Sequence, residues 1–121
     1  KLTNSRMALT GQEKADIESA MVDFLTRRRP PEHIRDKFDI AWRLDGQSVV
    51  IFEIRPFWRD PSHKIEEAVA KATYVRKSKR WKIYWQRADL KWHGYPPYPE
   101  AVFFEEFLAV VDEDENACFW G

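Results

Sequence analysis

"RWKIYWQRADLKWHGY" (residues 80–95) decides the fold, because apolar and polar side chains alternate along it. Successive side chains of a β-strand point to opposite faces of the sheet. The alternation predicts two strands, over residues 80–86 and 90–95, joined by a four-residue turn at 86–89. The large apolar side chains that this arrangement puts on one face are Trp81, Ile83, Trp85 and Trp92. Large aromatic residues are highly buried in folded proteins, so we expect this face to lie in the core.

The opposite face of the same two strands combines basic groups with aromatic rings. Its predicted members are Lys82, Tyr84, Gln86, Lys91, His93 and Tyr95. Cations for phosphates and rings for bases are what a platform for single-stranded nucleic acid needs. The candidate nucleic-acid-binding residues are therefore Arg76, Arg80, Lys82, Tyr84, Lys91 and His93. Many solvent-exposed sheet faces have a similar composition, and no RNP motif, zinc knuckle or helix-turn-helix accompanies this one.

Periodicity along the rest of the chain predicts the remaining elements. Thr10 and Glu13 fit a capping box, and apolar residues follow them at spacings of three and four. Asp45-Gly46 is a two-residue hairpin signal that would pair Trp42 with Val49. The predicted elements are a helix over 11–28, strands over about 37–44, 47–55, 69–76, 80–86 and 90–95, a helix over 99–111, and an apolar C-terminal tail over 117–121.

The order of these elements predicts the architecture. All strand connections but one are short enough for hairpins, which favours neighbouring antiparallel strands. The chain has eight Phe, six Trp and four Tyr, so a few elements can close one core. We expect a single α+β domain over residues 1–121. Its sheet is a five-stranded antiparallel β-meander, with an N-terminal and a C-terminal helix packed on one face.

Charge is balanced overall but divided along the chain. Lys and Arg number 20, as do Asp and Glu. Residues 71–91 carry eight basic side chains and one acidic one, whereas residues 100–115 carry seven acidic side chains and no Lys or Arg. Two interpretations remain open. Either the basic segment is a polyanion-binding face beside an acidic segment, or the acidic C-terminal helix docks on the basic sheet.

An enzymatic interpretation rests on Asp39 and Glu53. Asp39 followed by Glu53-Ile54-Arg55 loosely resembles the Asp…Glu-x-Lys arrangement of metal-dependent nucleases. The predicted hairpin register puts the two carboxylates on opposite faces of the sheet, and a permanently charged arginine cannot act as the base. We therefore expect Glu53 and Arg55 to form a structural ion pair, and the enzyme to be the less favoured alternative.

Other chemistry finds little support in the sequence. His33, His63 and His93 are about thirty residues apart, so we expect no metal site and no cofactor. Cys118 is the single cysteine, which excludes an internal disulfide and favours the cytoplasm. No apolar stretch is long enough to span a bilayer, so we expect no membrane partner.

The prolines and aromatic residues of "GYPPYPEAVFF" (94–104) supply an alternative to nucleic-acid binding. Such a segment can form a patch for a protein partner or for self-association. The sequence therefore predicts a non-enzymatic binding module, with nucleic acid, another protein or a second copy of the chain as its partner.

Three segments carry a resemblance to a known family. They are "FEIRPFWRDP" (52–61), "AVAKATYVRKSKRWKIYWQRADLKWHGY" (68–95) and "VVDEDENACFWG" (110–121). Their recognisable parts are Glu-x-Arg-Pro, Trp-x-x-Tyr-Trp and a closing Phe-Trp-Gly. In these motifs the chain resembles the bacterial domain-of-unknown-function family numbered 3024, over nearly its whole length. The resemblance implies a small bacterial protein and supplies no activity.

Overall fold

The computed structural model describes residues 8–120 of the chain. Its elements, in order, are α2 (Gly11–Arg28), a short 3-10 helix η1 (Glu32–Ile34), β1 (Asp39–Asp45), β2 (Ser48–Phe57), β3 (Asp60–Val75), β4 (Arg80–Gln86), β5 (Trp92–Gly94), β6 (Glu100–Ala101) and α3 (Phe104–Glu113). The strands β1 to β5 are neighbours in chain order, and all pairs are antiparallel. The predicted α+β meander is confirmed, with the short β6 added beside β4.

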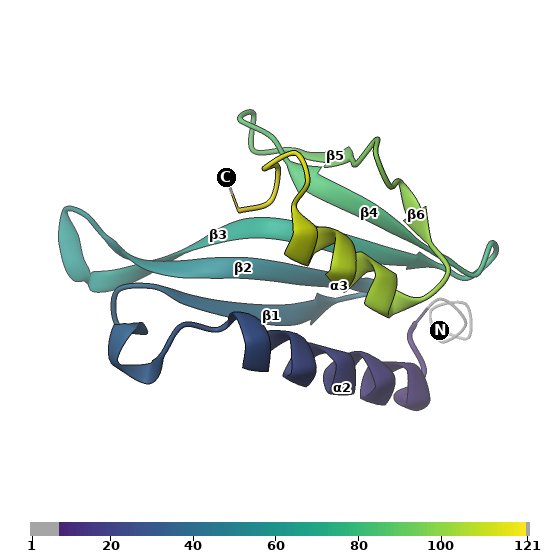
Figure 1. Cartoon of the computed structure of the whole chain (residues 1–121), viewed down its shortest axis with the longest axis horizontal. Helices are drawn as coiled ribbons and strands as arrows, with labels where there is room; N and C mark the ends of the chain where they lie inside the picture. The colour runs from purple at the N-terminus through teal and green to yellow at the C-terminus, as the bar shows by residue number, and fades with distance from the viewer. Residues whose placement is uncertain (1–7, 121) are drawn as a thin grey trace.

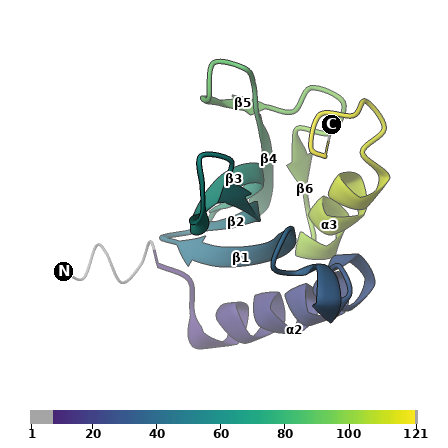
Figure 2. The same cartoon turned by 90° about the vertical axis from the view of Figure 1, so that its left-hand side faces the viewer.

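Both helices lie on the same side of a strongly twisted sheet (Figure 1; Figure 2). The core fills the space between them and that side of the sheet. Fully buried side chains come from both helices and from the central strands, among them Met21, Phe24, Val49, Ile51, Ile83, Phe107 and Val111. Neither α2 nor α3 covers the other side of the sheet.

The bounds and the buried face of α2 are those that its sequence predicts. The Thr10 hydroxyl accepts a hydrogen bond from the Glu13 N–H at 3.0 Å, and the Glu13 carboxylate accepts one from the Thr10 N–H at 2.8 Å. This capping box satisfies two of the N–H groups that a helix start leaves free. The apolar stripe of Ile17, Met21 and Phe24 is buried, and the helix ends where Pro30 follows its cap.

The hairpin between β1 and β2 differs from the predicted register by two residues. Asp45 pairs with Ser48 and Trp42 with Ile51, so Gly46 and Gln47 form the two-residue loop. Gly46 has a φ of +63°, as the first position of a type II′ turn requires. An Asp45-Gly46 loop would have needed positive φ at Asp45 as well. Because the shift is an even number of residues, every side chain keeps its predicted face.

Strand β3 is longer than predicted. It begins at Asp60, not at residue 69, and forms a ribbon with the second half of β2 that ends at the turn Trp58-Arg59. Pro56 and Pro61 lie within this ribbon, where free outer edges leave some backbone N–H groups without strand partners and so tolerate proline. Val69 is the extra residue of a β-bulge, because Ile51 pairs with Ala70 and Phe52 with Ala68.

The predicted pairing of β4 with β5 is wrong by three residues. Gln86 pairs with Trp92 and Trp85 with His93, so the loop runs over residues 87–91. Leu90 adopts the left-handed conformation in this loop, with a φ of 63°. An odd shift exchanges the two faces of β5. Trp92 therefore leaves the predicted core face, and His93 leaves the predicted outer face.

The predicted face of Tyr95, which follows β5, is affected as well. Tyr95 is 2% exposed and packs on Phe119 at a ring distance of 4.8 Å, so its predicted place on the outer face is wrong as well. The predictions for Trp81 and Trp85 hold. Trp81 is 6% exposed, and Trp85 is partly buried against the core.

The C-terminal helix begins later than predicted, at Phe104 rather than residue 99, because residues 100–101 form β6. The Glu106 carboxylate accepts hydrogen bonds from the N–H groups of Val102 and Phe103, both at 2.8 Å, and so caps the helix start. Beyond the helix, the Asp114 carboxylate accepts hydrogen bonds from the N–H groups of Phe119 and Trp120. These bonds fold the tail back over the end of α2, where Trp120 stacks on Phe24.

The burial of the core residues leads to a prediction about stability. Phe107 on α3 is fully buried, so Phe107→Ala leaves a cavity in a close-packed interior. We expect the free energy of unfolding to fall by about 3–5 kcal/mol, measured by urea denaturation. Phe103→Ala, four residues earlier and 66% exposed, is the matched control and should change stability by about 0.5 kcal/mol or less.

Candidate functional site: the uncovered sheet face

The face of the sheet opposite the helices is assembled by the strand registers. Val50 pairs with Lys71, Lys71 with Tyr84, and Gln86 with Trp92, and residues paired across antiparallel strands share a face. We call this surface the uncovered face. Its described members include Val50, Phe52, Lys71, Lys82, Tyr84, Gln86 and Trp92. The face thus runs from β2 across β3 and β4 to β5.

A lysine held between two aromatic rings lies at the centre of this face. The Lys71 ammonium is 4.9 Å from the centre of the Tyr84 ring and 5.0 Å from the centre of the Trp92 ring. Both distances are within the range of a cation–π contact. Burial by the surrounding side chains lowers the pKa of Lys71, and the negative charge of Asp45 opposes this shift. The group is thus a partly dehydrated cation beside two rings.

A second aromatic group continues the uncovered face toward β1. The Arg43 guanidinium lies 4.8 Å from the centre of the Phe52 ring and forms an ion pair with Glu66 at 2.9 Å. Beside it is a hollow of about 600 Å³ between the β2–β3 ribbon and the β4–β5 loop. Its lining includes Phe52, Ala68, Gln86 and Leu90. A hollow of this size accommodates a small planar group.

Several cations near the uncovered face have no carboxylate partner within residues 8–120. They are Lys71, Arg80, Lys82, Arg87 and Lys91, none of which forms an ion pair there. The acidic C-terminal helix does not dock on them. Asp112 of α3 instead pairs with Arg27 and Arg28 of α2, on the helix side of the sheet. The acidic helix thus packs on β3 and β4 of the basic sheet, but on the face opposite these cations, and it does not pair with them.

The structure separates the six predicted nucleic-acid-binding residues into two groups. Lys82 and Tyr84 lie on the uncovered face, with Arg80 at its edge and Lys91 in the adjoining loop. Arg76 lies elsewhere, because its guanidinium binds the Glu13 carboxylate at 2.8 Å and the Ala8 carbonyl at 2.9 Å. His93 pairs with Trp85 on the opposite face, and its Nε2 lies 2.9 Å from Asp89. Neither Arg76 nor His93 is free to contact a ligand on the uncovered face.

Sequence reasoning missed Lys71 and Trp92 as members of the site. Lys71 alternates with the buried Ala70 and Ala72 inside the predicted strand 69–76, so the face it occupies could have been read from the sequence. The face of Trp92 could not be read from the sequence, because it depends on the length of the β4–β5 loop.

The residues of the nuclease alternative are not brought together. Ile40, not Asp39, pairs with Glu53, so the two carboxylates point to opposite faces. Each is bound by an arginine. Arg29 contacts Asp39 with two hydrogen bonds of 2.8 Å, and Arg55 donates to Glu53 at 2.8 Å, which is the pairing expected from the sequence. Among residues 8–120, no three His, Cys, Asp or Glu side chains are placed to hold a metal ion.

The Asp39 ion pair links the end of α2 to β1 and should depend on pH. The hydrogen bonds from Arg29 lower the pKa of Asp39, with a smaller contribution from the Ile40 N–H. A lowered pKa in the folded state means that the pair stabilises the protein fully above the pKa of an unfolded aspartate, about 3.9. This stabilisation is lost as the pH falls through the lower pKa of the folded protein.

We expect Asp39→Asn to reduce the free energy of unfolding by about 1 kcal/mol at pH 7, because Arg29 is partly exposed to solvent. Urea denaturation at about pH 2.5 should show a smaller difference between the variant and the wild type. Asp36→Asn is the control, since Asp36 is exposed and forms no ion pair within residues 8–120. If Asp39→Asn lost the same free energy of unfolding at both pH values, the ion pair with Arg29 would not be the cause of the loss.

The fold and the site define a small α+β domain with one sheet face covered by helices and one that carries cations and aromatic rings. Residues 9–121 match the model of a family described as a domain of unknown function (DUF3024), so the chain belongs to this family. The resemblance seen in the sequence is thereby confirmed. No curated protein and no solved structure matches the chain. Within residues 8–120 no helix combines the length and apolar character needed to cross a bilayer.

Proposed function

We propose that the protein is a non-enzymatic binding module whose uncovered face binds single-stranded nucleic acid. The observation that carries the proposal is the Lys71 ammonium held between Tyr84 and Trp92 on a face that neither helix covers. Lys82 on the same face, and Arg80 and Lys91 nearby, add positive charge without carboxylate partners in the described part of the chain. Rings and unpaired cations together are the elements of a single-strand platform.

The geometry suggests how a strand would bind. A base stacks on the Tyr84 or Trp92 ring in place of the ammonium, and the released Lys71 contacts a neighbouring phosphate. Lys82 lies two residues from Tyr84 on the same face and can contact the next phosphate. The hollow beside Phe52 can hold a further base. Because every base has a π-face, such stacking favours single strands without selecting a sequence.

The aromatic rings predict the effect of substitution. Tyr84→Ala and Trp92→Ala should each weaken binding of a fluorescein-labelled oligo(dT), because stacking on one ring contributes about 1–3 kcal/mol. The dissociation constant, measured by fluorescence anisotropy at low salt, should rise roughly 5-fold to 150-fold. Tyr98→Ala is the matched control, since Tyr98 is exposed and donates to Glu106 away from the uncovered face.

Two outcomes would contradict this proposal. One is the absence of an anisotropy change with wild-type protein at low salt. The other is equal weakening by Tyr84→Ala and Tyr98→Ala. Affinity must also fall with rising salt, because phosphate contacts release counterions. A neutral Lys82→Gln variant should reduce that salt dependence, whereas Lys14→Gln, at an exposed position on α2, should leave it unchanged.

A protein partner is the second candidate, and exposed apolar side chains favour it. Within the segment 94–104, Val102 is 48% exposed and Phe103 is 66% exposed. Two adjacent apolar side chains in water indicate a contact surface more strongly than one. The lone Cys118 supports action in the reducing cytoplasm for either candidate, and a bacterial source remains an inference from the sequence motifs.

Self-association at this segment is tested by sedimentation velocity. If a second copy is the partner, the sedimentation coefficient of the wild type should rise with concentration, and Phe103→Ser should restore the monomer value. Val22→Ser, at an exposed apolar position on α2, is the control. A concentration-independent monomer would rule out a second copy and leave a different protein as the partner.

A further inference from the structure

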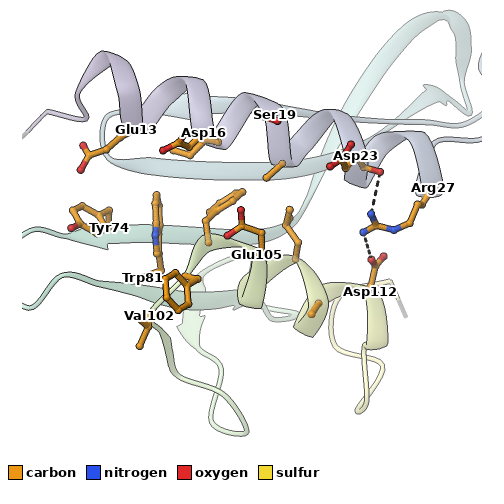
Figure 3. Close-up of a pocket in the computed structure, with 16 residues that line it drawn as sticks. Glu13, Asp16, Ser19, Asp23, Arg27, Tyr74, Trp81, Val102, Glu105 and Asp112 are labelled. Carbon is orange, nitrogen blue, oxygen red and sulfur yellow. Dashed lines mark hydrogen bonds and ion pairs between the residues drawn. The ribbon is translucent and has the colours of Figure 1, made fainter.

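A groove runs between α2 and α3, on the helix side of the protein and away from the uncovered face. Its volume is about 660 Å³. Residues from Glu13 to Arg27 of α2 form one wall, and residues from Val102 to Asp112 form the other (Figure 3). At 1.5 Å per residue, the α2 wall is about 21 Å long. The groove is therefore elongated, as a docking site for a helix would be.

The floor of the groove is apolar and the upper walls carry small side chains. Trp81 and Tyr74 of the sheet, with Leu108 of α3, line the bottom. Ser19 of α2 and Ala109 of α3 line the sides, and both are exposed. Trp81 and Leu108 are only 6% and 4% exposed, so the apolar surface that a partner can reach comes mainly from Tyr74, Val102 and Phe103. At the β6 end, the exposed Val102 and Phe103 extend this apolar surface to the rim.

The rim is acidic. Figure 3 shows Asp16 and Asp23 of α2 and Glu105 of α3 around the opening. Within residues 8–120 none of these three carboxylates forms an ion pair. The one basic residue in the lining is Arg27, and its charge is offset by Asp112 at 2.8 Å. A partner that fills the groove thus meets apolar contacts below and unpaired negative charge on both sides.

We propose that this groove docks a basic amphipathic helix of a partner protein. The apolar side chains of the partner, spaced i, i+3, i+4 and i+7, occupy the floor, and flanking Lys or Arg side chains pair with the acidic rim. About 14 residues of helix match the length of the α2 wall. Charge complementarity selects this occupant, because phosphate groups are repelled by the same carboxylates. The inference deepens the second candidate function and does not depend on nucleic-acid binding.

The test uses two synthetic 14-residue fluorescent peptides with the same leucine seam. One carries lysines beside the seam and the other carries glutamates at the same positions. Fluorescence anisotropy should show the lysine peptide binding the full-length protein at least tenfold more tightly than the glutamate peptide. Equal affinity for the two peptides would overturn the proposal.

Two pairs of variants locate the binding. Ala109→Trp fills the groove and should weaken binding of the lysine peptide at least tenfold, whereas Ala15→Trp, at an exposed position on α2 outside the groove, should not. Glu105→Lys at the rim should weaken it several-fold more than Glu18→Lys outside the groove. Thermal unfolding by circular dichroism confirms that each variant is folded.

The remaining outcomes also decide the question. Equal binding by Ala109→Trp and Ala15→Trp would show that the peptide binds elsewhere and would overturn the proposal. So would concentration-dependent dimerisation that Ala109→Trp abolishes, because a second copy would then occupy the groove. Oligo(dT) binding should be the same in Ala109→Trp and the wild type, which separates a failure here from a failure of the nucleic-acid proposal.

Discussion

The packing of Trp81 is the contact on which the rest of the structure depends. Its indole lies between Tyr74 on the neighbouring strand, at a ring distance of 5.1 Å, and Phe104 at the start of α3, at 5.0 Å. This places α3 on the same side of the sheet as α2. It also fixes the orientation of β4, because a strand that turns Trp81 and Ile83 toward the helices must turn Lys82 and Tyr84 away from them. One buried ring thus determines both where the core lies and which side chains face the other way.

One-sided cover explains why a chain with no net charge presents two unlike surfaces. The helix side carries the carboxylates of α2 and α3 above an apolar groove. The uncovered face carries Lys71 and Lys82 among aromatic rings. Arg28 at the end of α2 adds little unpaired positive charge to the helix side. Its guanidinium pairs with Asp112 and lies 4.2 Å from the centre of the Trp120 ring. Behind the equal totals of acidic and basic residues, lysines without carboxylate partners lie on one side of the sheet and the unpaired carboxylates Asp16, Asp23 and Glu105 lie on the other, within residues 8–120.

The sequence predicted the fold well because the period of two is robust to small errors in pairing. The β1–β2 hairpin is shifted by two residues from the prediction, and each of its side chains still lies on the predicted face. The β4–β5 pairing is shifted by three, and both Trp92 and His93 were misplaced. That loop depends on Leu90 in the left-handed conformation, which leucine rarely adopts and no local pattern indicates. For the same reason the sheet faces of the β4 residues Lys82 and Tyr84 were predicted correctly, whereas those of the β5 residues Trp92 and His93 were exchanged.

The position of Lys71 is hard to explain by stability alone. Its strand neighbours Ala70 and Ala72 are fully buried on the other face, and its own ammonium is partly dehydrated against Tyr84 and Trp92. A leucine could cover the same rings without the desolvation cost that lowers the pKa of the lysine. Cation–π contacts return about 0.5–2 kcal/mol of that cost. A cation that is already partly desolvated in the free protein loses less on meeting an anion. This partial desolvation is therefore the physical basis of the phosphate contact that we propose for Lys71.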